Sequence, residues 1–210
     1  MKVIVFGAGG GVGRMVVEWA LKAGHEVTAA ARFAEAVKTK NPNLTVVEVD
    51  VTDANSVKPL LAKQEAVIST LGVKRNHVTT YMSTGIANII QGMHNHNVKR
   101  LVCVSSGGVN PQRDPNNSIF FEFLVKKFYI NNVLNDFRRM EKLVMESGLD
   151  WTIVRPMQVI GEMGKGEYRV AEGYSLPDGR KITLADLAHF VVKVIENDEY
   201  IHKGLAIANI

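Results

Sequence analysis

Cysteine is nearly absent from the chain, and so are long apolar runs. The 210 residues include one cysteine, Cys103, so no internal disulfide can form and no cysteine cluster can hold a metal ion. Cys103 lies in an apolar run and is predicted to be a small core residue rather than a nucleophile. The N-terminal apolar run, residues 3–6, is far shorter than a signal peptide or a membrane span. We therefore expect a protein of a reducing compartment, with the cytoplasm as the default location and no bound metal.

A strong excess of one charge is also missing. The chain has 25 lysines and arginines against 21 acidic residues, a net charge of +4, and the basic residues form no long run. A nucleic-acid partner would require a clustered basic stripe, so we expect neither a nucleic-acid partner nor a membrane partner. A hydrophobic share of 46% in 210 residues supports one substantial core and is marginal for two domains. With no linker or repeat, residues 1–210 are predicted to form a single domain, as a monomer or a small homo-oligomer.

Short apolar runs alternate along the chain with segments of helical periodicity. The expected strands are residues 2–6, 26–31, 44–49, 66–69, 100–105, 151–154 and 204–208. The expected helices are residues 11–23, 53–59, 79–95, 120–129, 132–147 and 184–196, with Asp53 and Thr183 as N-caps. Residues 161–182 are expected to form a loop with a hairpin, as a small C-terminal elaboration. Continuous apolar strands that alternate with helices are typical of a Rossmann-type α/β fold, a doubly wound parallel sheet.

A glycine-rich turn follows the first strand and opens the first helix. It reads Gly7-Ala8-Gly9-Gly10-Gly11-Val12-Gly13. The G-x-G-x-x-G spacing fails here, whereas G-x-x-G-x-x-G fits at Gly7, Gly10 and Gly13. Glycines at such a turn allow a tight bend, close approach of a diphosphate and close packing of helix on strand. The free N–H groups of the helix would bind the diphosphate. We predict that Gly7, Gly9, Gly10, Gly11, Val12 and Gly13 bind a dinucleotide.

The end of the second strand indicates which dinucleotide binds. An acidic residue there usually binds the ribose hydroxyls of NAD, but this strand ends in three alanines followed by Arg32. A planar, charged guanidinium can bind a 2′-phosphate, so we predict NADP(H) as the cofactor. The alternative is that Arg32 is a solvated loop residue. Asp50-Val51 after the third strand and Leu71-Gly72 after the fourth are expected to lie along the cofactor.

The ends of the fifth and sixth strands are expected to meet beside the nicotinamide. Ser105 and Ser106 follow the fifth strand, and the segment from Pro156 to Ile160 follows the sixth. We expect Pro156 and its neighbours to hold the carboxamide through backbone groups, and Ser106 to orient the nicotinamide or the acceptor. The alternative for the serines is hydrogen bonding to nearby backbone. No G-x-S-x-G motif surrounds them, which disfavours acyl chemistry.

Taken together, these motifs resemble those of a known family. The motifs are the glycine turn, Asp50-Val51, Leu71-Gly72, Ser105-Ser106, residues 146–149, Arg155-Pro156 with Ile160-Gly161, and residues 186–190. With them, nearly the whole chain resembles the atypical short-chain dehydrogenases/reductases, specifically the small NAD(P)H-binding reductases that include biliverdin reductase B, also called flavin reductase. The resemblance implies hydride transfer from NADPH to a planar acceptor that is flavin-like, quinone-like or a tetrapyrrole.

Three departures from the related enzymes qualify this expectation. The Tyr-x-x-x-Lys pair of typical short-chain dehydrogenases is absent: Tyr81 is followed four places on by Gly85, and Tyr129 by Val133. Gln158 stands where biliverdin reductase B has a histidine near the substrate, so it is our second candidate catalytic residue after Ser106. The loop 107–118 also differs. A non-enzymatic NADP(H)-binding redox sensor fits the missing pair as well, whereas an epimerase or dehydratase acting on a nucleotide sugar is disfavoured by the short chain.

Overall fold

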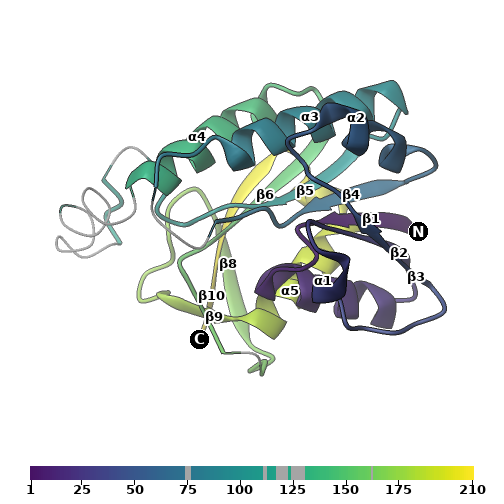
Figure 1. Cartoon of the computed structure of the whole chain (residues 1–210). Coiled ribbons are helices and arrows are strands. Elements are labelled where there is room, and N and C mark those ends of the chain that lie inside the picture. Colours follow the sequence, from purple (N-terminus) through teal and green to yellow (C-terminus); the bar gives the residue numbers. More distant parts are fainter. Residues whose placement is uncertain (74–76, 111–112, 117–122, 124–130, 162) are drawn as a thin grey trace.

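An eight-stranded sheet in the order β3-β2-β1-β4-β5-β6-β10-β8 forms the centre of the computed structural model (Figure 1). The structure describes residues 1–73, 77–110, 113–116, 123, 131–161 and 163–210. The strands are β1 (Lys2–Phe6), β2 (Glu26–Ala31), β3 (Leu44–Glu48), β4 (Ala66–Ser69), β5 (Arg100–Val104), β6 (Asp150–Pro156), β8 (Tyr168–Glu172) and β10 (Lys203–Asn209). Neighbouring strands are parallel, except for the antiparallel pair β10 and β8. This topology confirms the predicted Rossmann-type sheet.

Helices cover both faces of the sheet (Figure 1). Helices α1 (Gly11–Lys22) and α5 (Leu184–Ile195) pack together on one face, and α3 (Tyr81–Asn95) and α4 (Asn131–Met145) pack together on the other, where the short α2 (Ala54–Val57) also lies. Side chains of one strand alternate between two cores: Val3 and Val5 pack with α1 and α5, whereas Ile4 and Phe6 pack with α3 and α4. Burial on both faces explains why the strands read as continuous apolar runs.

The ends of the helices follow local signals in the sequence. Asp53 caps α2 by accepting a hydrogen bond from Asn55 N, and Thr183 caps α5 by accepting one from Asp186 N, as predicted. The described residues also include the 3₁₀ turns η1 (Ala34–Ala36), η2 (Lys58–Leu61) and η4 (Asp198–Tyr200). Of the predicted helix 120–129, only Phe123 lies among the described residues.

The predicted hairpin within residues 161–182 is wrong. Strand β8 pairs with β10 at the edge of the main sheet, and β9 (Lys181–Thr183) pairs in parallel with β7 (Gln158–Ile160) in a separate two-stranded sheet. The reason is that each strand finds a partner distant in sequence: β10 offers β8 an open edge, and β9 runs beside β7 before entering α5. Strand β8 therefore extends the main sheet beyond β10, and β7 with β9 forms a second, two-stranded sheet.

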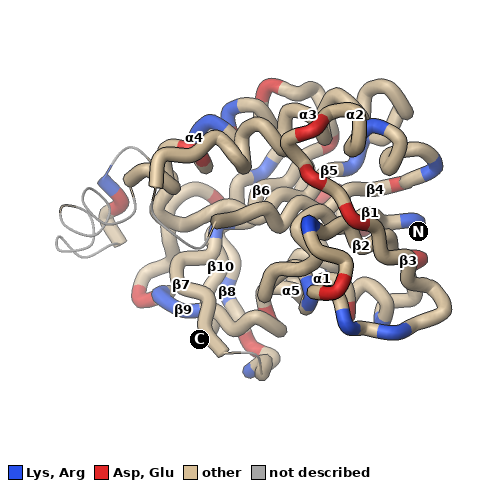
Figure 2. The backbone as a smooth tube through the Cα atoms, viewed as in Figure 1, with Lys and Arg blue, Asp and Glu red and all other residues tan. Residues whose placement is uncertain are grey.

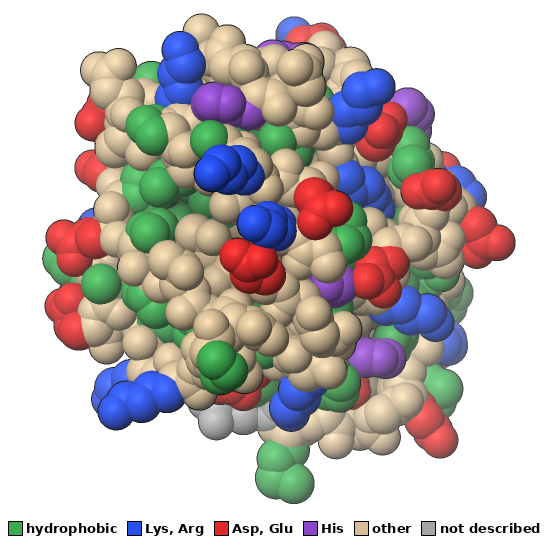
Figure 3. Space-filling view, turned by 90° about the vertical axis from the view of Figure 1, so that its right-hand side faces the viewer, with side chains coloured by type: hydrophobic (Ala, Val, Ile, Leu, Met, Phe, Trp, Pro, Cys, Tyr) green, Lys and Arg blue, Asp and Glu red, His purple; other side chains and the backbone are tan. Residues whose placement is uncertain are grey.

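Charged residues are distributed over the whole molecule. Basic and acidic positions are interspersed along the backbone (Figure 2), and the side that carries the N-terminus shows both signs intermingled (Figure 3). Among the helices that the structure describes, none is long and apolar enough to cross a membrane.

Candidate cofactor site

Two glycines of the turn are required by the packing of the protein itself. Gly7 has φ +82°, and a Cβ there would lie 2.8 Å from the carbonyl oxygen of Thr70. A Cβ on Gly13 would overlap the carbonyl oxygen of Gly7 and lie 2.7 Å from Thr70 Oγ1. Because β1, α1 and the residue after β4 meet here without room for a side chain, Gly7 and Gly13 allow the close packing of helix on strand.

At two other positions of the turn, the packing of the protein itself does not require a glycine. A Cβ on Gly10 would meet only the Gly7 carbonyl oxygen, at 3.3 Å, and a Cβ on Gly11 only the methyl groups of Leu184, at 3.8 Å. Both residues are exposed. Gly10 is the N-cap of α1 and provides no side-chain cap, and the first turn of α1 contains no acidic residue. The space in front of these N–H groups and the positive end of the helix therefore fit a diphosphate.

The predicted 2′-phosphate residue, Arg32, lies exposed just after β2. Its guanidinium lies over the ring of Tyr81, with Cζ 4.7 Å from the ring centroid. Asp50 is exposed nearby, and its carboxylate accepts hydrogen bonds from the N and Oγ1 of Thr52, at 2.9 Å and 2.8 Å. Those hydrogen bonds lower the pKa of Asp50 below its usual value, and the positive charge of Arg32 lowers it further. This end of the site therefore combines a fixed carboxylate with an accessible cation.

Val51 follows Asp50 after β3, and Leu71 and Gly72 follow β4. Val51 and Leu71 are buried, and the Val51 carbonyl accepts a hydrogen bond from Asn88 Nδ2 at 2.9 Å. Gly72 is exposed, and a Cβ there would meet nothing within 4 Å. A Cβ on Gly85 would lie 2.8 Å from Val51 Cγ2 and 2.9 Å from Leu71 Cδ1. Gly85 thus lets α3 pack closely against Val51 and Leu71. The sequence alone does not reveal this role, because Gly85 stands inside a helical pattern.

The ends of β5 and β6 come together as predicted. Ser105 N donates to the Val154 carbonyl, and Gly107 N donates to the Pro156 carbonyl, both at 2.8 Å. Ser105 is 5% exposed, and its Oγ has no hydrogen-bond partner among the described residues. Because an unpaired buried hydroxyl costs about 1–3 kcal/mol, Ser105 Oγ is a suitable partner for a polar group of a ligand.

Ser106 is the less buried of the two serines, and its Oγ accepts a long hydrogen bond of 3.4 Å from Gly108 N. The Ser106 hydroxyl is therefore only weakly bound by the nearby backbone. The backbone of Gln158 pairs with β9, its N donating to the Arg180 carbonyl at 3.1 Å, while the residue itself is exposed. Ile160, at the end of β7, is half-buried.

The loop 107–118 is attached to the chain between β8 and β9. Asp114 is buried, and its carboxylate accepts hydrogen bonds from Ser175 N at 2.8 Å and Asn116 N at 2.9 Å. Arg138 of α4 holds the start of the loop by donating to the Val109 carbonyl at 2.8 Å. Residues 111–112 and 117–118 lie outside the described residues.

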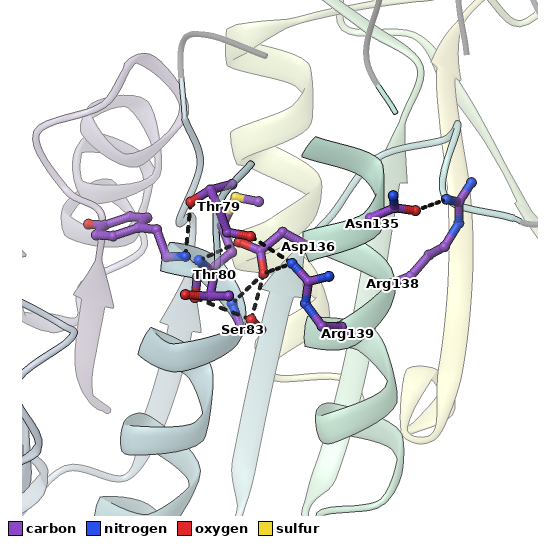
Figure 4. Close-up of polar contacts among 9 residues, drawn as sticks. Thr79, Thr80, Ser83, Asn135, Asp136, Arg138 and Arg139 are labelled. Carbon is purple, nitrogen blue, oxygen red and sulfur yellow. Dashed lines mark hydrogen bonds and ion pairs between the residues drawn. The ribbon is translucent and has the colours of Figure 1, made fainter. Parts of the chain in front are cut away.

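A buried carboxylate that the sequence analysis missed anchors α3 to α4. Asp136 of α4 is fully buried and accepts hydrogen bonds from Met82 N at 2.9 Å, Ser83 N at 3.3 Å and Ser83 Oγ at 2.5 Å (Figure 4). Arg139 pairs with the same carboxylate at 3.2 Å and donates to the Thr79 carbonyl at 2.6 Å. Asp136 thus caps the N-terminus of α3 from a neighbouring helix. In the sequence it reads as an ordinary polar residue of an amphipathic helix.

Cys103 is a core residue, as predicted. It is completely buried, and burial raises the pKa of its thiol to about 12. A thiol that stays neutral is a poor nucleophile and a poor metal ligand. Within the part of the chain that the structure describes, no group of three or more His, Cys, Asp or Glu residues is arranged to hold a metal ion.

The fold and the glycine turn define a dinucleotide-binding protein. Residues 7–198 match the family described as NAD(P)H-binding, and the chain belongs to that family. A curated relative, "Uncharacterized protein YwnB" of Bacillus subtilis (strain 168), is 23% identical over 204 residues, which are 95% of this chain and 93% of the relative.

Solved structures share the fold over almost the full length. A protein from Streptococcus pneumoniae TIGR4, described as "a putative NADH-flavin reductase", has a TM-score of 0.78 and 24% identity, covering 100% of both chains. A short-chain dehydrogenase/reductase from Veillonella parvula DSM 2008, in complex with NADP, has a TM-score of 0.81 and 15% identity, covering 99% of this chain and 94% of that one. These likenesses support the Rossmann-type assignment.

Proposed function

We propose that the protein is an NADPH-dependent reductase that passes hydride to a planar acceptor of the flavin, quinone or tetrapyrrole type. The observation that carries the proposal is the open N-terminus of α1. There Gly10 and Gly11 leave space that internal packing does not require, in a chain of an NAD(P)H-binding family. When bound, NADPH supplies the hydride, and the protein binds and orients the two reactants.

The preference for NADPH over NADH is proposed from the charges around Arg32. The residue that follows β2 is Arg32 rather than an acid, and the neighbouring carboxylate of Asp50 accepts hydrogen bonds from Thr52. Arg32 is exposed and able to direct N–H groups at a phosphate. We therefore propose that Arg32 supplies the cation that binds a dianionic 2′-phosphate.

The reacting end of the proposed site contains hydroxyl and amide groups. Ser105, Ser106 and Gln158 can donate hydrogen bonds, but none of them is a strong general acid. Hydride transfer to a flavin leaves an anion that takes its balancing proton from water, so no protein acid is required. We propose that Ser105 and Ser106 orient the nicotinamide and the acceptor, with Pro156 and Ile160 lining the same end.

Exposed apolar side chains support a planar, largely apolar acceptor. Val78, Phe123 and Met163 are 83%, 61% and 87% exposed. They lie in segments that follow β4, β5 and β7. We propose that these side chains contact the acceptor, because exposed apolar groups at a binding site are typical of ligand contact. Of the aromatic segment 120–129, Phe123 alone lies among the described residues.

A screen of NADPH consumption against flavins, quinones and tetrapyrroles tests the proposal. We expect turnover with at least one acceptor class, faster with NADPH than with NADH, and none in a Gly10→Val control. Binding of NADPH without oxidation by any acceptor would favour the redox-sensor alternative. The cytoplasmic location, the monomeric or small homo-oligomeric state and the lack of nucleic-acid or membrane partners stay predictions from the sequence.

A further inference from the structure

The contact between Arg32 and Tyr81 joins two distant parts of the chain. Arg32 follows β2, and Tyr81 is the first residue of α3. The Arg32 guanidinium carbon lies 4.7 Å from the centroid of the Tyr81 ring. A cation in this position is attracted by the negative face of the ring. The ring therefore favours one placement of an arginine side chain that is otherwise exposed.

Tyr81 is itself firmly placed. Its backbone N donates to Thr79 Oγ1 at 3.1 Å, and the next two residues of α3, Met82 and Ser83, donate their backbone N–H groups to the buried carboxylate of Asp136. Arg139 links that carboxylate to the Thr79 carbonyl (Figure 4). The first turn of α3 is thus fixed to α4, so the ring that meets Arg32 projects from an anchored backbone.

The position of the Arg32 guanidinium over the Tyr81 ring is compatible with hydrogen bonding by its N–H groups to a ligand. A guanidinium that uses one face for an aromatic ring keeps its N–H donors at the planar edge, where they can bind a phosphate. A free arginine side chain loses rotamer entropy when it binds. Stacking on Tyr81 reduces that loss before the ligand arrives.

We propose that Tyr81 is a positioning residue that holds Arg32 for the 2′-phosphate of NADP(H) and thereby sets part of the preference over NAD(H). This inference rests on the proposed function, in which Arg32 binds the 2′-phosphate. It adds a specificity role for a tyrosine that does not belong to a Tyr-x-x-x-Lys pair. The role is confined to the 2′-phosphate, because NADH has no group for Arg32 to bind there.

Calorimetric titration of the full chain with NADPH and with NADH tests the inference. Tyr81→Leu is expected to weaken NADPH binding about two- to five-fold, the factor that corresponds to an exposed cation–π contact, and to leave NADH binding unchanged. Tyr81→Phe keeps the ring face and is expected to bind both cofactors like the wild type. In an Arg32→Ala background, Tyr81→Leu is expected to cause no further selective loss. Tyr81→Gln repeats the test if the leucine variant does not fold, with thermal unfolding as the check on folding.

Equal losses for NADPH and NADH in Tyr81→Leu, or a selective loss in Tyr81→Phe, would overturn the role of the ring. So would an unchanged NADPH affinity in a folded Tyr81→Leu protein. Failure of the underlying function has a different signature: Arg32→Ala would leave the cofactor preference intact, or the wild type would bind neither cofactor.

Discussion

Replacement of Gly10 by valine separates the cofactor site from the stability of the fold. Gly10 has φ −78° and ψ 167°, an extended conformation that valine adopts readily. A Cβ there would lie 3.3 Å from the Gly7 carbonyl oxygen, so a shift of a few tenths of an ångström accommodates it. Glycine is a better N-cap than valine, and we expect Gly10→Val to lower the free energy of unfolding by about 1 kcal/mol.

The effect on cofactor binding is expected to be much larger. The valine side chain would fill the space in front of the α1 N–H groups, where the diphosphate is proposed to bind. Each charge-assisted hydrogen bond contributes about 1.5–3 kcal/mol, so loss of two lowers the affinity by roughly two to four powers of ten.

Gly13→Ala provides the matched control for this prediction. Its Cβ would overlap the Gly7 carbonyl oxygen, and overpacking of this kind costs about 1–3 kcal/mol of stability. Thermal unfolding and calorimetry with NADPH measure both quantities for each variant. If folded Gly10→Val protein bound NADPH with wild-type affinity, the diphosphate would not lie at this turn.

The remaining predictions concern four individual side chains. Arg32→Ala should weaken NADPH binding by about one to two powers of ten and leave NADH binding almost unchanged; calorimetry showing equal losses would assign Arg32 another role. Ser106→Ala should lower turnover more than it weakens NADPH binding, because positioning acts mainly on hydride transfer. Gln158→Ala should reduce flavin turnover only modestly. A larger loss of turnover in Gln158→Ala than in Ser106→Ala would make Gln158 the more important residue. Cys103, whose pKa burial raises to about 12, should resist alkylation in the folded protein at neutral pH and react once the protein unfolds. Because the pKa of Cys103 is higher in the folded than in the unfolded protein, the folded state binds the thiol proton more tightly. The contribution of Cys103 to the free energy of unfolding should therefore be complete below the ordinary thiol pKa and should decline as the pH rises toward 12.

The parts of the fold that follow local rules were predictable from the sequence. Val3 to Phe6 reads as one apolar run because successive side chains enter two different cores. Asp53 and Thr183 cap helices with their own side chains, and such caps are visible as short motifs. The glycine turn was predictable for the same reason, since strand, turn and helix are contiguous.

Features that depend on distant partners were not predictable in this way. The pairing of β8 with β10 and of β9 with β7 is decided by which sheet edges are open, and local turn residues suggested a hairpin instead. Asp136 meets its partners only after α3 and α4 pack together. The stack of Arg32 on Tyr81 likewise requires the end of β2 to meet the start of α3.

Rapid mixing of the wild-type protein with NADPH and excess flavin measures the proposed hydride transfer itself. We expect rapid oxidation of bound NADPH, slower oxidation of NADH under the same conditions, and no oxidation in the folded Gly10→Val variant. Tight NADPH binding without oxidation by flavins or quinones would contradict the reductase assignment and leave a cofactor-binding sensor in its place.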